Sequence, residues 1–156
     1  MERSMSTQRR GRRIAMEDHE RDAFLAEQRV CRVATNGPSG PHATPLWFVW
    51  DNECLWLYSL TRSQRWADIT RQPRIAVVVD TGHDYLELRG VELVGDAEVV
   101  GEVPRTGQPQ PALKTPENLF AAKYVGLDTL PYDGQHAWLR IRPETIRSWD
   151  FRKLGG

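Results

Sequence analysis

The residues best suited to chemistry lie together between positions 59 and 65, where hydroxyl and guanidinium side chains alternate. The segment places hydroxyls at the end of an expected strand and cations at the start of an expected short helix: Ser59, Thr61, Arg62, Ser63 and Arg65. At a helix N-terminus, free N–H groups and the positive end of the helix dipole both face outward, so such a corner attracts anions. A small β domain with this corner suits a phosphorylated cofactor better than a bare metabolite. The first prediction is therefore an anion site between Ser59 and Arg65.

Sequence motifs for other chemistries are missing. No two histidines stand four residues apart and no cysteine accompanies one, so a zinc site is not expected at any of them: His19, His42, His83 and His136. There is no G-x-S-x-G motif, no Walker loop and no dinucleotide-binding glycine pattern. Cys31 and Cys54 occur in strand-like runs, where two buried free thiols are expected rather than a disulfide or a metal pair. Catalytic residues remain unknown at this point.

Length and composition limit the possible partners. A chain of 156 residues is expected to form one domain with a real core. The formal net charge is 0 and 27% of the residues are charged, so no strong field favours nucleic acid or an acidic membrane. No apolar run approaches the roughly 20 residues that a membrane-spanning helix needs. We therefore expect a cytoplasmic protein that binds neither nucleic acid nor membrane.

The elements that must position the anion corner follow from hydrophobic periodicity. Residues 1–16 form a basic arm for which we expect disorder, with contact to a polyanion or a partner subunit as the alternative. Residues 17–156 form the folded domain, with helices near 17–29, 63–72 and 116–125. Alternating or apolar runs separated by turn residues predict strands at 30–35, 42–50, 54–58, 75–80 and 136–142, with a possible extension at 145–149. Residues 85–89 and 91–100 are expected to form either a pair of strands or one bent strand. Hairpin order and two short helices favour a mainly β fold, a small barrel of six or seven antiparallel strands.

Several segments, in this order, resemble a known family. They are Ser63–Ile69 with Gln72-Pro73-Arg74, the strand Leu55–Ser59, the strand Leu88–Val99, and the ending Leu139–Pro143 with Ser148-Trp149-Asp150. Together they resemble the pyridoxamine 5'-phosphate oxidase-like split β-barrels over about residues 24–154. The arginine-rich composition and the Ser-Trp-Asp ending look most like the flavin/deazaflavin oxidoreductase branch, whose members use FMN or coenzyme F420.

This resemblance implies roles for particular residues. The phosphate-gripping lysine of the family falls on Arg65, with Arg62, Ser63, Ser59 and Thr61 at neighbouring contacts; a guanidinium keeps the charge and adds a planar fork. The remaining implied cofactor residues belong to strands that would wall the ring: Trp47, Phe48, Val78 and Val79. Trp47 is either a cofactor-facing aromatic or plain barrel core. The resemblance also implies a homodimer with the cofactor at the subunit interface, which Lys123-Tyr124 and Trp149-Asp150 could reach from the neighbouring subunit.

The function implied by the resemblance is hydride transfer from a reduced cofactor, F420 or alternatively FMN, to an unsaturated organic acceptor. The protein would bind, orient and shield the cofactor, which carries the chemistry. If a proton is needed, Tyr124, Lys123 or a water would supply it. A non-catalytic flavin, deazaflavin or haem carrier accounts equally well for Arg65, and a barrel that has lost its cofactor is a third reading. A pyridoxamine 5'-phosphate oxidase proper is disfavoured, because no substrate-phosphate cluster is visible near the C-terminus.

Overall fold

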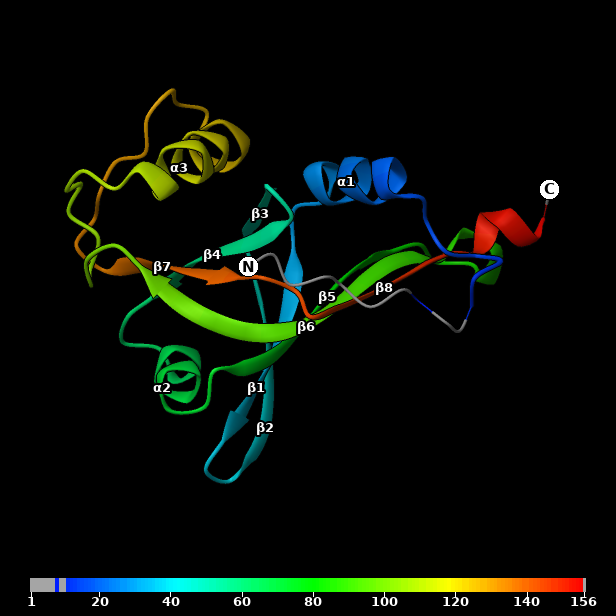
Figure 1. The fold of residues 1–156 in the computed structure, drawn as a ribbon, viewed down its shortest axis with the longest axis horizontal. Helices are drawn as coiled ribbons and strands as arrows, with labels where there is room; N and C mark the ends of the chain where they lie inside the picture. The colour runs from blue at the N-terminus through cyan, green and yellow to red at the C-terminus, as the bar shows by residue number, and fades with distance from the viewer. Residues whose placement is uncertain (1–7, 9–10, 156) are drawn as a thin grey trace.

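The computed structural model describes Gln8 and residues 11–155, which form one curled antiparallel sheet flanked by helices (Figure 1). The strands are β1 (Cys31–Gly37), β2 (Gly40–Leu46), β3 (Phe48–Asp51), β4 (Cys54–Leu60), β5 (Arg74–Thr81), β6 (Arg89–Val100), β7 (His136–Ile141) and β8 (Thr145–Asp150). They follow the order β2-β1-β5-β6-β7-β4-β3, with β8 paired to β6. The predicted mainly β, antiparallel split-barrel fold is confirmed.

The sheet has eight strands rather than six or seven because the expected strand 42–50 is broken at Trp47. Its first part, β2, pairs with β1, whereas its second part, β3, pairs with β4. Of the two alternatives for residues 85–100, a pair or one bent strand, the structure has a single strand, β6, preceded by the 3-10 turn Tyr85–Glu87. Residues 145–149, expected as an extension, form the separate strand β8.

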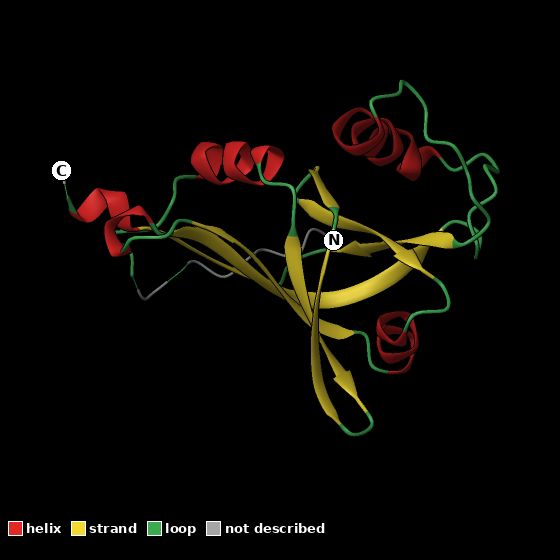
Figure 2. Cartoon of the chain, turned by 180° about the vertical axis from the view of Figure 1, so that it is seen from behind, coloured by secondary structure: helices red, strands yellow, loops and turns green. Residues whose placement is uncertain are grey.

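Three α-helices flank the sheet: α1 (Asp18–Glu27), α2 (Gln64–Arg71) and α3 (Lys114–Phe120). A π-helical turn over Ala121–Val125 continues α3, and 3-10 turns occur at Pro111–Leu113 and Phe151–Leu154. The hairpin of β1 and β2 extends away from the rest of the sheet, while α2 and α3 lie on opposite sides of the sheet end made by β4, β6 and β7 (Figures 1 and 2). No helix in the described part of the chain is long and apolar enough to cross a membrane.

Strand β6 holds the two parts of the sheet together because it changes partners along its length. Its first half pairs with β5 and β8, and from Ala97 to Val100 it pairs with β7. The change occurs beside Gly95, where a Cβ atom would lie 2.7 Å from the Arg142 carbonyl oxygen. Only glycine allows the two backbones to approach this closely.

The strand β4 is buried on both of its faces and separates two apolar cores. Leu55 and Leu57 point into the barrel interior, whereas Trp56 and Tyr58 point outward to a second cluster with Phe120 of α3. Side chains of a strand alternate between its faces, so the continuous apolar run of β4 reflects these two cores. The second core brings α3 over the outer face of β4 and β7.

A buried ion-pair network fixes the loop between β6 and α3. The Arg105 guanidinium donates two hydrogen bonds to Glu117, of 2.9 and 3.1 Å, and one of 2.5 Å to Glu102. Glu117 also accepts from the Trp138 indole at 2.9 Å and from the Tyr132 hydroxyl at 2.8 Å. Every hydrogen-bonding atom of the Glu117 carboxylate is therefore satisfied, as a buried charge requires.

Part of the basic arm 1–16 lies outside the described residues. Of its described residues, Gln8 contacts the outer edge of β8, where its side chain bonds both the N–H and the carbonyl of Ser148. Farther on, the Ile14 carbonyl accepts from the Asp150 N–H at 2.7 Å and the Met16 N–H donates to the Ser148 hydroxyl. These contacts satisfy backbone groups that an edge strand leaves open.

The network predicts a large loss of stability for Glu117→Gln. The variant keeps the side-chain shape but leaves the buried Arg105 with one carboxylate, so we expect the free energy of unfolding to fall by about 3 kcal/mol. Urea denaturation measures it. The matched control is Glu98→Gln, which removes a half-exposed partner of Arg140 and should cost less than about 1 kcal/mol. Equal losses in the two variants would contradict the assigned role of the network.

Candidate functional site

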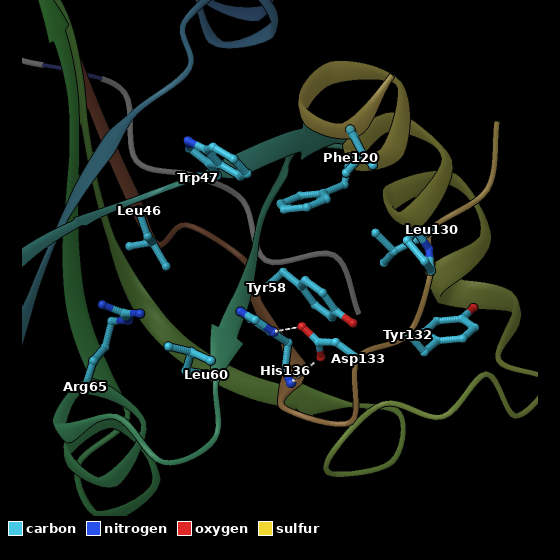
Figure 3. Close-up of a pocket in the computed structure, with 12 residues that line it drawn as sticks. Leu46, Trp47, Tyr58, Leu60, Arg65, Phe120, Leu130, Tyr132, Asp133 and His136 are labelled. Atoms are coloured by element: carbon cyan, nitrogen blue, oxygen red, sulfur yellow. Dashed lines mark hydrogen bonds and ion pairs between the residues drawn. The ribbon is translucent and has the colours of Figure 1, made fainter. Parts of the chain in front are cut away.

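A pocket of about 480 Å³ lies between the outer face of β4 and β7, α2, and the segment from α3 to β7 (Figure 3). Its walls are mostly apolar and aromatic, with a few polar side chains among them: Leu46, Trp47, Tyr58, Leu60, Arg65, Phe120, Val125, Leu130, Pro131, Tyr132, Asp133 and His136. This combination of a largely apolar wall and a few convergent polar groups is typical of small-molecule sites.

Strand register determines which side chains face the pocket. Tyr58 pairs with Trp138 across β4 and β7, and Leu60 pairs with His136. Residues two apart on one strand share a face, as do residues directly opposite on paired strands. Tyr58, Leu60 and His136 therefore stand together on the outer face of the sheet.

Aromatic rings form the walls of the pocket. The Tyr58 ring stacks on the His136 imidazole, with centroids 4.9 Å apart, and meets Phe120 edge-on at 5.5 Å. Trp47 stacks on Tyr124, with centroids 4.6 Å apart and planes 8° from parallel. Rings held in this way present flat faces and edges to a ligand of similar shape.

Trp47 takes its position from the break between β2 and β3. Tyr124 of the π-helical turn occupies that break: its hydroxyl accepts from the Phe48 N–H at 3.1 Å and lies 2.8 Å from the carbonyl oxygens of Arg29 and Phe48. Burial raises the pKa of Tyr124 to about 12, although the Phe48 N–H bond acts in the opposite direction. The neutral hydroxyl therefore locks the backbone on which Trp47 stands.

Arg65 is the cation of the pocket. Its Nη1 donates to the Thr44 hydroxyl at 2.8 Å, while its buried Nε has no hydrogen-bond partner among the described residues. Burial lowers the pKa of Arg65, and no carboxylate of the described chain opposes this effect. A half-buried guanidinium without an acidic partner is a site for an anionic ligand group.

The hydroxyls predicted beside Arg65 are engaged elsewhere. The Ser63 hydroxyl caps α2, accepting from the Trp66 N–H at 3.1 Å and donating to the Leu60 carbonyl at 2.8 Å. Thr61 donates to the Gln135 carbonyl at 3.2 Å, and the Ser59 side chain is fully buried, 3.4 Å from the Leu60 carbonyl oxygen. Arg62 is exposed to solvent. The expected convergence on one corner is not formed by these side chains.

The other predicted wall residues lie away from the pocket. Phe48 and Val79 are buried in the barrel interior, and Val78 is on the opposite face of β5. Trp149 covers Gly90 on the part of the sheet formed by β6 and β8, where the Asp150 carboxylate pairs with Arg152. Of the nine predicted cofactor residues, Trp47 and Arg65 line the pocket.

Sequence reasoning missed the polar pair at the middle of the pocket. Nδ1 of His136 lies 2.5 Å from the Asp133 carboxylate, which also accepts from the backbone N–H groups of Gln135 and His136. Burial raises the pKa of Asp133, but these bonds outweigh it and hold the pKa below its ordinary value. The available signal was the Asp-x-x-His spacing just before a strand, a common arrangement for a turn.

Comparison with known proteins identifies the family of the chain. Residues 17–150 match the sequence profile described as pyridoxamine 5'-phosphate oxidase. The chain belongs to the pyridoxamine 5'-phosphate oxidase family. No curated protein matches it significantly.

Solved structures of the same fold include a protein described as FAD-binding and one described as an F420 reductase. A conserved hypothetical protein, Rv2991 of Mycobacterium tuberculosis, is 31% identical, with a TM-score of 0.77 over 97% of this chain and 94% of its own. An FAD-binding protein of Mesorhizobium loti is 18% identical, with a TM-score of 0.65 over 86% and 93%. An F420 reductase is 23% identical, with a TM-score of 0.58 over 80% and 94%. The last two likenesses concern the fold alone.

Lys123 stands beside this site and predicts a pH dependence of stability. Its Nζ lies 4.3 Å from the Phe48 ring centroid, and burial, with the nearby Arg29 charge, lowers its pKa to about 8 from about 10.5. Between these values the Lys123 side chain binds more protons in the unfolded chain than in the folded chain, so its own contribution to the free energy of unfolding rises with pH. We therefore expect the free energy of unfolding to change less favourably with pH in Lys123→Met than in the wild-type protein, in denaturation measured from pH 8 to 10.5. The exposed Lys114→Met is the matched control, and identical slopes in all three proteins would contradict the prediction.

Proposed function

We propose that this protein is an oxidoreductase that binds F420, or alternatively FMN, in the pocket and serves hydride transfer to an unsaturated organic acceptor. The observation that carries the proposal is the Arg65 guanidinium, half-buried and free of acidic partners, on the wall of an aromatic pocket. Both cofactors combine a flat ring system with a phosphate. The family membership adds weight, because structures of this fold include an FAD-binding protein and an F420 reductase.

The residues of the pocket fit such a molecule. The Arg65 guanidinium lines the pocket without an acidic partner, and a guanidinium pairs well with phosphate. Tyr58, Phe120 and Trp47 offer the apolar faces against which a flat ring packs. When bound, the cofactor supplies the hydride, while these side chains bind it, orient it and exclude water.

We favour F420 over FMN as the cofactor because of the resemblance to the deazaflavin branch and the arginine-rich composition. Parallel titration with both cofactors tests the proposal, and tryptophan emission is a suitable signal because Trp47 lines the pocket. Oxidation of reduced F420 in the presence of a cyclic enone then tests turnover. Micromolar binding without turnover across a varied acceptor panel would support a carrier, and binding of neither cofactor would end the proposal.

Arg65→Gln should weaken cofactor binding by roughly ten- to hundredfold, since a hydrogen bond to a charged group contributes about 1.5–3 kcal/mol. The titration described above measures the dissociation constant. Arg62→Gln is the matched control: it removes the same side chain three residues earlier, at an exposed position, and should change the constant less than about twofold. Equal effects of the two variants would contradict the assignment of the phosphate to Arg65.

We also propose that the protein is a homodimer that covers the open side of the pocket. Trp47, Leu60 and Val125 line the pocket and are 47%, 41% and 42% exposed, so a large apolar surface faces solvent in the single chain. Such a surface marks an interaction site. A twofold interface would bury it and close the pocket around the cofactor.

Trp47→Glu should therefore shift the protein from dimer to monomer in sedimentation equilibrium, because the interface would have to bury an unpaired carboxylate. Tyr85→Glu is the control, since Tyr85 is 66% exposed, packs on Phe151 and does not line the pocket. A wild-type monomer, or a dimer lost only in Tyr85→Glu, would contradict the proposed interface.

A further inference from the structure

Asp133 and His136 are joined by one more hydrogen bond than is needed to close the turn before β7. Two backbone N–H groups, those of Gln135 and His136, already bond the Asp133 carboxylate and close the turn before β7. The His136 ring adds a third bond through Nδ1, at 2.5 Å. Since the carboxylate is an acceptor, Nδ1 carries the proton and the other ring nitrogen, Nε2, is left for a different partner.

The position of His136 directs Nε2 into the pocket. The residue begins β7 opposite Leu60, and its ring stacks on Tyr58 with planes 19° apart, so packing and the Asp133 bond together restrict rotation of the ring. The ring edge away from Asp133 faces the part of the pocket bounded by Leu46, Leu60 and Arg65 (Figure 3).

The His136 ring bonds within the described chain only through Nδ1, its side chain is 26% exposed, and the surrounding walls of the pocket are mostly apolar. A molecule that enters the pocket displaces solvent from Nε2, so it binds well only if it supplies a hydrogen-bond partner for this atom. A second polar point, Arg65, stands beyond Leu60 in the same pocket. The two polar groups differ in their chemistry, because Arg65 is a permanent cation and His136 is an imidazole held in one orientation.

We propose that His136 Nε2 is a ligand-binding atom, which recognises a carbonyl oxygen or ring N–H at the edge of a flat cyclic molecule in this pocket. Asp133 is its positioning residue. A neutral imidazole accepts from a ring N–H, and a protonated one donates to a carbonyl oxygen. This chemistry belongs both to the ring of a flavin or deazaflavin and to an enone or quinone acceptor. The first source rests on the proposed function, and the second does not.

The ring nitrogen itself provides the test. The ¹⁵N resonances of the four histidines are recorded in the full chain alone, then with FMN, with F420 and with menadione, a flat quinone. His136 is assigned by its loss in His136→Gln. The matched control pair is His83 and Asp84, which has the same chemistry at a bond length of 3.1 Å but lies on the surface, with side chains 97% and 79% exposed.

We expect the Nε2 resonance of His136, and not that of His83, to move on ligand addition. His136→Gln should raise the dissociation constant of the same ligand about fivefold or more, and His83→Gln should leave it unchanged. Asp133→Asn should weaken binding to a lesser degree, since an amide oxygen still accepts the Nδ1 bond.

The outcomes distinguish a cofactor ring from an acceptor as the ligand of Nε2, and they test this inference separately from the proposed cofactor function. A response to FMN or F420 assigns Nε2 to the cofactor ring, and a response to menadione alone assigns it to the acceptor. Menadione moving Nε2 while neither cofactor binds would end the proposed cofactor function and leave this inference intact. An unmoved Nε2 resonance with all three ligands would overturn the inference, even where a cofactor binds, and this readout in the wild-type chain does not depend on a variant folding.

Discussion

The antiparallel pairing of β4 with β7 is the constraint on which the site depends. Both strands are buried on two faces, one toward the barrel interior and one toward α3, so their register decides which side chains reach the pocket. Because the side-chain period of a strand is two, a slip of one residue would turn Tyr58 and Leu60 inward and bring Leu57 and Ser59 out. Apolar packing on both faces at once fixes this register far more firmly than a half-exposed sheet would.

Helix α3 reaches its place through the same pairing. It packs its Phe120 ring on Tyr58 and Trp138, while Glu117 joins Arg105 to the Trp138 indole. A buried ion pair adds little net stability compared with apolar packing, but it strongly disfavours arrangements that leave either charge unpaired. The network therefore specifies where the segment between β6 and β7 crosses the sheet, and with it the far wall of the pocket.

Two side chains that line the pocket have a buried polar atom without a hydrogen-bond partner in the described chain. These atoms are Nε of Arg65 and the Tyr58 hydroxyl, and Nε1 of the core residue Trp56 also lacks a partner. Glu117 and Asp68, in contrast, have their bonds completed within the chain, and His136 bonds through Nδ1 alone. Polar atoms without partners in an otherwise well-satisfied structure indicate a place where a bound molecule completes the bonding. The family fold is shared by proteins of different activities, so these particular side chains, more than the barrel, carry the argument for function.

The sequence by itself determined the antiparallel mainly β architecture, the short helix ended by Pro73, and the place of Arg65 in the first turn of that helix. These features depend on local signals: alternation, turn residues, and a cation at the start of a helix. Only the tertiary structure decided which neighbours accompany Arg65. Ser59, Thr61 and Ser63 are close to it in sequence, but their hydroxyls are used elsewhere. The Ser59 side chain is buried, the Thr61 hydroxyl donates to the Gln135 carbonyl, and the Ser63 hydroxyl caps α2. His136, 71 positions away by residue number, reaches the same pocket because β7 pairs with β4, and no local pattern contains that pairing.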